Sequence, residues 1–145
     1  MKPPKHAPRG GVFLSHSSKD RAFVERLAAV LKSHGVKYWY SAAHIAGATQ
    51  WHDEIGRALQ RSEWFLLILT PNSVRSDWVK HELLYALNET RYKARIIPLL
   101  ARSCKFSRLS WTLKEFQFLD FREDFHQGCR KLSKIWGKKL TNGAK

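Results

Sequence analysis

Short apolar runs alternate with amphipathic stretches along most of this chain, and this alternation constrains the fold more than any other feature. Five segments have the length and the β-branched or aromatic content of buried strands: 11–16, 36–40, 63–70, 95–100 and 116–121. Helical patterns separate the first four, 101–115 is irregular, and an amphipathic helix closes the pattern near Trp136. Single helices between strands predict parallel pairing through right-handed crossovers.

The helical stretches show apolar faces and recognisable ends. Ser17 or Ser18 is expected to cap the first helix, which Gly35 ends. Ser76 is expected to cap the third helix, whose Val79 and Leu83 face inward. At 145 residues the chain has room for one domain. We therefore expect an α/β, flavodoxin-like, doubly wound five-stranded parallel sheet of order 2-1-3-4-5, with helices on both faces.

The ends of the chain differ from its middle. Residues 1–10 are expected to form a flexible basic arm, 11–136 the domain, and 137–145 a basic tail or a linker to a further domain. In the fourth strand, Pro98 indicates a position near a strand end or at an edge, because proline cannot donate to a ladder.

A ligand site in such a sheet lies beyond the carboxyl ends of the strands, where the strand order reverses. Here that point lies between the first and third strands, beside the loop 41–49. Trp78 and Glu82 are four residues apart, so we expect them to project together, away from the Val79/Leu83 face. By position alone, Glu82 could equally be a surface glutamate at a helix N-terminus, and Trp78 a half-buried packing residue.

The sequence lacks the motifs of several common classes of enzyme and binding site. No G-x-G-x-x-G, G-x-x-x-x-G-K-[ST] or G-x-S-x-G stretch is present, and the histidines lack helical metal-site spacing. Ser15 and His16 are strand neighbours that point to opposite faces, which disfavours a nucleophile pair. The acids near helix starts are expected to be helix-dipole partners: Asp20, Asp53, Glu54 and Asp77. The sequence has no apolar run of about 18 residues and no signal-peptide pattern, so we expect a cytoplasmic protein without a membrane span.

The net charge of +14 is concentrated in a few places. Residues 1–10 and 130–145 hold nine bases and no acid. Further bases lie in the middle of the chain: Arg91, Lys93, Arg95, Arg102, Lys105 and Arg108. Such patches attract polyanions, although basic tails can also serve solubility alone. We expect weak, salt-sensitive polyanion binding through the basic ends, without sequence preference.

Three segments resemble the Toll/interleukin-1 receptor (TIR) domain family, and the resemblance covers about residues 11–136. VFLSHSSKD (12–20) is similar to the family's first box, and IAGATQWHDEIGRAL (45–59) to the loop and helix after its second strand. SEWFLLILTPNSVRSDWVKHELLYAL (62–87) resembles its longest signature, which ends in S-x-W-x-x-x-E-L. Many TIR domains are NAD+ glycohydrolases or cyclases, and others are non-enzymatic adaptors.

The resemblance to the bacterial-type enzymes implies a site and an activity. It makes Glu82 the catalytic acid, with NAD+ as substrate and neither a metal nor a cofactor. It implies substrate contacts from these residues: Trp78, His16, Ser17, Ser18, Gly47, Ala48 and Thr49. Enzymes of the family often carry bases after the first box, where this chain has Ser17 and Ser18, which leaves the pyrophosphate contact open. The adaptor loop signature, Arg-Asp followed by Pro-Gly, is replaced by Ala46 and Gly47.

The expected reaction yields nicotinamide with ADP-ribose or a cyclic ADP-ribose isomer, in immune defence or signalling, with activation by homotypic self-assembly. The sequence does not separate hydrolysis from cyclisation. Two alternatives stay open at this point: a non-catalytic TIR interaction module that works by homotypic assembly, and a nucleic-acid-associated protein that uses the basic ends.

Overall fold

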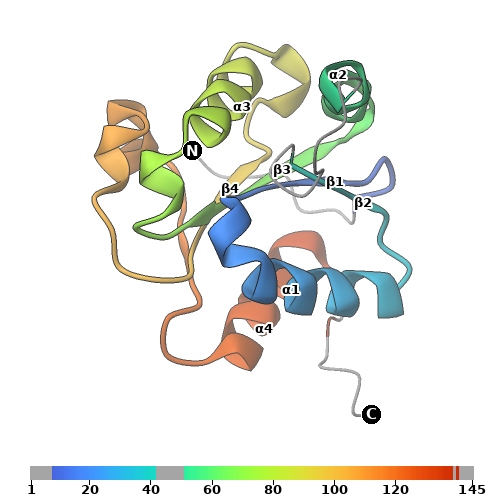
Figure 1. Cartoon of the computed structure of the whole chain (residues 1–145). Helices are drawn as coiled ribbons and strands as arrows, with labels where there is room; N and C mark the ends of the chain where they lie inside the picture. The colour runs from blue at the N-terminus through green and yellow to red at the C-terminus, as the bar shows by residue number, and fades with distance from the viewer. Residues whose placement is uncertain (1–7, 42–50, 139, 141–145) are drawn as a thin grey trace.

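A five-stranded parallel sheet forms the middle layer of the structure, a computed structural model that describes residues 8–41, 51–138 and 140 (Figure 1). Its order is β2-β1-β3-β4-β5, as the sequence predicted. The strands are β1 Val12–Ser15, β2 Tyr38–Tyr40, β3 Trp64–Leu69, β4 Ile96–Leu100 and β5 Leu119–Asp120. The order reverses at β1, so the carboxyl ends of β1 and β3 define the edge where a ligand site is expected.

Helices cover both faces of the sheet. Helices α1 (Arg21–Ser33) and α4 (Phe125–Trp136) lie on one face, and α2 (Trp51–Arg61) and α3 (Asp77–Leu87) on the other (Figure 1). Five 3-10 turns complete the described elements: η1 Ser18–Asp20, η3 Ser73–Arg75, η4 Thr90–Tyr92, η5 Phe106–Arg108 and η6 Trp111–Glu115. Among the described residues, no helix is long and apolar enough to cross a membrane.

Side-chain alternation along the strands divides the interior into two cores. Val12 and Leu14 of β1 pack with residues of α1 and α4. Phe13, between them in sequence, packs with residues of α2 and α3, and its ring stacks on Phe65 of β3 at 5.6 Å between centroids. A residue's parity along a strand therefore decides which core its side chain enters.

The first helix begins differently from the prediction. Ser17 caps the short turn η1 by accepting a hydrogen bond from the Lys19 N–H, and α1 starts only after Asp20. Gly35 follows the helix with φ +75°, a conformation that glycine adopts without strain, so the predicted end is confirmed. The two cysteines, Cys104 and Cys129, are free thiols.

The fifth strand is shorter than the predicted 116–121, and Pro98 explains why. Pro98 is the third residue of β4, an interior strand, so the expected strand end or edge position is wrong. Backbone groups alternate in direction along β4, and the Leu100 carbonyl accepts from the Phe121 N–H, so the Pro98 nitrogen also points toward β5. Because that nitrogen has no hydrogen to donate, the ladder begins only at the Leu99–Leu119 pair.

Substitution by alanine should have opposite effects on stability at two helical glycines. A Cβ at Gly128 of α4 would lie 2.5 Å from the Phe121 ring, whereas one at Gly56 of α2 would meet nothing within 4 Å. We expect Gly128→Ala to lower the free energy of unfolding by about 1–3 kcal/mol through overpacking. Gly56→Ala should raise it by up to about 1 kcal/mol through helix propensity. Urea unfolding followed by circular dichroism measures both, and equal effects would contradict this packing of α4.

Candidate active site

Glu82 lies inside the fold, on the second turn of α3. Ser76 fixes the start of this helix by accepting a hydrogen bond from the Val79 N–H at 3.2 Å. Glu82 is 3% exposed, so the surface-glutamate alternative is excluded. The prediction that it projects away from the core face is wrong, because Val79, Glu82, Leu83 and Ala86 have i, i+3, i+4, i+7 spacing and form one buried stripe.

Two serine hydroxyls hold the Glu82 carboxylate. Ser15 donates to Oε1 at 2.7 Å, and the Ser41 hydroxyl lies 2.8 Å from both Oε1 and Oε2. All three residues are buried. A buried carboxylate is costly unless hydrogen bonds replace its hydration, and these hydroxyls supply such bonds. The arrangement presents an acceptor group at the carboxyl edge of the sheet.

Neither Ser15 nor Ser41 was among the predicted site residues, although the sequence carries a signal for both. Ser15 ends β1 and Ser41 directly follows β2, and the Leu14–Tyr40 register makes the two serines neighbours across the ladder. Their parity matches that of Phe13, so both face α3. Hydroxyls at the ends of two adjacent strands, opposite a helix that carries a glutamate, are the pattern that would have found them.

His16 lies on the other face of the sheet. Its ring packs edge-on against Tyr40 at 6.0 Å, and Tyr40 packs against the core formed with α1 and α4. Nδ1 lies 2.9 Å from the Leu14 carbonyl oxygen, a contact that places the ring proton on Nδ1. Burial and a hydrogen bond with Tyr38 raise the pKa of Tyr40 to about 12, so its phenol is protonated at neutral pH. The structure does not bring His16 to Glu82.

Asp20 joins the loops that follow β1 and β3. Its carboxylate accepts hydrogen bonds from the Thr70 hydroxyl at 2.5 Å and from the Asn72 side-chain amide at 2.9 Å. Asp20 lies at the start of α1, as predicted, and makes no side-chain hydrogen bond to that helix, so its carboxylate serves this cross-link as well. Because Asp20 is 7% exposed, the cross-link is shielded from water and holds two loops that border the site.

The remaining predicted site residues are dispersed. Trp78, one turn before Glu82, is 38% exposed and packs edge-on against His81 at 5.8 Å. Ser17 is buried at the start of η1, and Ser18 is exposed. The other three predicted residues, Gly47, Ala48 and Thr49, lie outside the described residues. The structure thus brings Glu82 to Ser15 and Ser41 and leaves Trp78 on the surface of the same helix.

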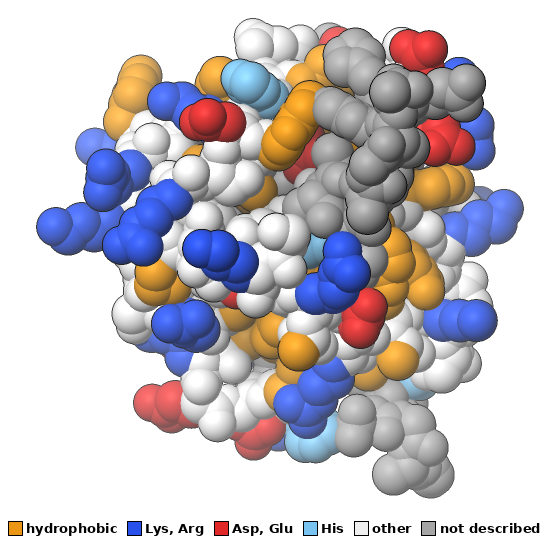
Figure 2. All heavy atoms as spheres, viewed as in Figure 1, with side chains coloured by type: hydrophobic (Ala, Val, Ile, Leu, Met, Phe, Trp, Pro, Cys, Tyr) orange, Lys and Arg blue, Asp and Glu red, His pale blue; other side chains and the backbone are white. Residues whose placement is uncertain are grey.

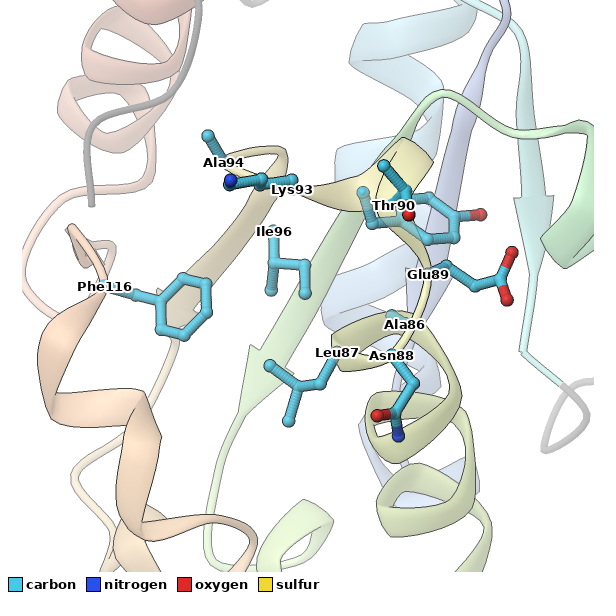
Figure 3. A pocket seen from close by; sticks show the side chains of 10 residues that line it. Ala86, Leu87, Asn88, Glu89, Thr90, Lys93, Ala94, Ile96 and Phe116 are labelled. Carbon is cyan, nitrogen blue, oxygen red and sulfur yellow. The ribbon is translucent and has the colours of Figure 1, made fainter.

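A hollow of about 410 Å³ lies at the C-terminal end of α3, and none of the predicted site residues lines it (Figure 3). Leu87, Ile96 and Phe116 line it with apolar surface, and Glu89 and Lys93 are its charged side chains. Among the described residues, no group of three or more His, Cys, Asp or Glu side chains is placed to hold a metal ion.

Comparison with known proteins identifies the family. The model of the TIR domain matches residues 12–133, so the chain belongs to the TIR domain family. The 2′ cyclic ADP-D-ribose synthase AbTIR of Acinetobacter baumannii is 30% identical over 81 residues, which cover 55% of this chain and 30% of that protein. The probable 2′ cyclic ADP-D-ribose synthase TcpB of Brucella abortus is 32% identical over 90 residues, 60% of this chain and 36% of that protein. The matches thus span about a third of these relatives.

Solved structures show the same fold. The TIR domain of the Toll-related receptor TRR-2 from Hydra magnipapillata has a TM-score of 0.66 at 20% identity, and covers 83% of this chain and 93% of that one. A TIR-STING receptor from C. gigas, solved with 2′,3′-cGAMP, has a TM-score of 0.69 at 20% identity, over 97% of this chain and 44% of that one. At these identities the likeness concerns the fold alone.

The serine hydrogen bonds can be tested by stability. Ser15→Ala removes a donor from a buried carboxylate, so we expect it to lower the free energy of unfolding by about 1–3 kcal/mol. In a Glu82→Gln background the loss should be about half as large, because hydrogen bonds to a charged group are stronger. The exposed Ser18→Ala should change stability by less than about 0.5 kcal/mol. Similar losses for Ser15→Ala and Ser18→Ala in chemical denaturation would contradict the contact.

Proposed function

We propose that this chain is the catalytic TIR domain of an enzyme that cleaves the nicotinamide–ribose bond of NAD+, with Glu82 at the reacting centre. The observation that carries the proposal is the buried Glu82 carboxylate, held by two hydroxyls at the sheet edge where strand order reverses. The names of the bacterial relatives, which are 2′ cyclic ADP-D-ribose synthases, support the same chemistry.

One carboxylate suffices for this reaction. The glycosidic carbon–nitrogen bond breaks with its electron pair going to the pyridinium nitrogen, so nicotinamide leaves neutral and needs no general acid. Glu82 offsets the positive charge that develops on the ribose, as a carboxylate does in glycosidases, and accepts hydrogen bonds from ribose hydroxyls. Attack by water then gives ADP-ribose and a proton, and attack by a group of the same molecule gives a cyclic isomer. The relatives' names favour the cyclic product.

The proposed substrate contacts surround this carboxylate. Trp78, on the same helix, would limit access of water, and Ser17 and Ser18 lie at the start of η1, beyond β1. Gly47, Ala48 and Thr49 complete the proposed set. Neither a metal nor a bound cofactor takes part in the proposed reaction. With this activity we propose a cytoplasmic role in immune defence or signalling.

Burial of Glu82 supports activation by self-assembly. At 3% exposure, the side chain must be uncovered before it can meet a ribose. Contacts with a second copy of the domain would offset the free energy needed to move the residues that cover Glu82. The same burial also favours a second candidate, a non-catalytic TIR interaction module in which Glu82 only secures the strand ends.

Glu82→Gln tests the catalytic assignment. It keeps the size of the side chain and removes its charge, so nicotinamide release should fall about a hundred- to a thousandfold. Asp77→Asn is the matched control, because it removes an exposed carboxylate from the first turn of the same helix and should leave the rate within about threefold. Chromatography of nicotinamide and of cyclic and linear ADP-ribose measures rate and product. A folded Glu82→Gln variant that matches the wild type would refute the role of Glu82.

Protein dilution tests the assembly requirement. We expect nicotinamide released per mole of chain to rise with protein concentration and to approach zero in the dilute monomer, with light scattering reporting the assembly. Specific activity that stays constant while the assembly dissociates would contradict activation by a neighbouring copy. If the assembled wild type releases no nicotinamide, the interaction-module alternative stands.

A further inference from the structure

The segment between β4 and β5 carries a net positive charge. Between positions 101 and 118 the chain has four bases and one acid, Glu115. The bases are Arg102, Lys105, Arg108 and Lys114, all exposed. Ion pairs between described residues join Arg95 to Glu63 and Arg122 to Asp120, and none involves these four bases. Figure 2 shows Lys and Arg side chains gathered on the side where Figure 1 draws this segment in light orange.

The carboxylate that follows in β5 does not neutralise this charge. Asp120 accepts hydrogen bonds from the Arg122 side chain and backbone N–H, at 2.9 Å each. These bonds lower the pKa of Asp120 to about 2, so it is ionised and already matched by Arg122. A further nitrogen of Arg122 donates to Ser103 at 2.8 Å, which ties the end of β5 to the basic segment.

An exposed tryptophan lies among these bases. Trp111, the first residue of η6, is 71% exposed, more than the other exposed large hydrophobic side chains among the described residues. In a 3-10 turn, residues three apart lie one above the other, so Lys114 follows Trp111 on the same side of η6. Leu109 and Leu113 are 2% and 0% exposed, and they anchor both turns in the core under α3. Because these buried side chains fix both turns, we expect little entropy to be lost on binding.

We propose that Arg102, Lys105, Arg108, Lys114 and Trp111 form a binding surface for single-stranded nucleic acid, independent of the Glu82 site. The bases contact phosphates, and the Trp111 ring stacks on an unpaired base, the combination that single-strand binders use. A duplex keeps its bases paired and offers no such face. A membrane surface would require several exposed apolar side chains, and Trp111 is the only large one on the described segment.

Fluorescence anisotropy with a labelled 12-nucleotide oligothymidylate tests the proposal on the whole chain. Trp111→Ala should weaken binding about five- to a hundredfold while leaving the melting temperature unchanged, because the ring is exposed. Trp111→Phe keeps a smaller aromatic ring, so its affinity for oligothymidylate should lie between those of the wild type and Trp111→Ala. Binding of a 12-base-pair duplex should change less than about twofold in Trp111→Ala.

Charge variants provide the second measurement. Lys105→Ala and Arg108→Ala should each reduce the slope of log affinity against log salt by about 0.7. The matched control, Lys32→Ala, removes one exposed base from α1 and should leave the slope unchanged. The basic ends are present in every variant, so their contribution cancels. Equal oligothymidylate binding by wild type and Trp111→Ala, or stronger binding to phosphatidylserine vesicles than to oligothymidylate, would overturn the proposal.

Discussion

The hydrogen bonds between Glu82 and the serines at the ends of β1 and β2 organise the candidate site. They connect a helix to two strands that are 67 and 41 residues away in sequence. A carboxylate in this position is stable only while hydroxyls replace its hydration, so the site requires the strand order and register that bring Ser15 beside Ser41. The acid proposed to act on NAD+ is therefore also a contact between α3 and the sheet.

The sheet separates groups of different chemistry, because neighbouring residues of a strand point to opposite faces. Ser15 faces α3 and reaches Glu82, whereas the next residue, His16, contacts Tyr40 on the opposite face. The positive charge between β4 and β5 lies on turns held by buried leucines, outside the Glu82 contacts. The Glu82 carboxylate and the bases of the proposed nucleic-acid surface can thus belong to one small domain without forming ion pairs with each other.

Elements of this fold are predictable from the sequence where the local pattern and the global fold agree. The continuous apolar strand Trp64–Leu69 and the helix stripe through Val79 and Leu83 identify a parallel sheet with covered faces. For 116–121 the alternating pattern overestimated the length of the fifth strand, because only Leu119–Asp120 pair with β4. Phe116 instead closes η6 through its bond to the Leu113 carbonyl, and Pro98 offers that stretch no donor. The cross-link made by Asp20 was not foreseen for a similar reason, because its partners Thr70 and Asn72 are about fifty residues away.

Periodicity and short motifs are properties of neighbouring residues, so they were enough to predict the class of fold, the strand order and the TIR family, and to select Glu82 as the candidate acid. The burial of Glu82, its hydrogen bonds to Ser15 and Ser41, and the position of His16 on the other face could be seen only in the folded chain. These features depend on register and on contacts between distant segments. A helix residue at the border of the apolar stripe faces water or the core according to what the sheet places opposite it, and here that is a pair of hydroxyls.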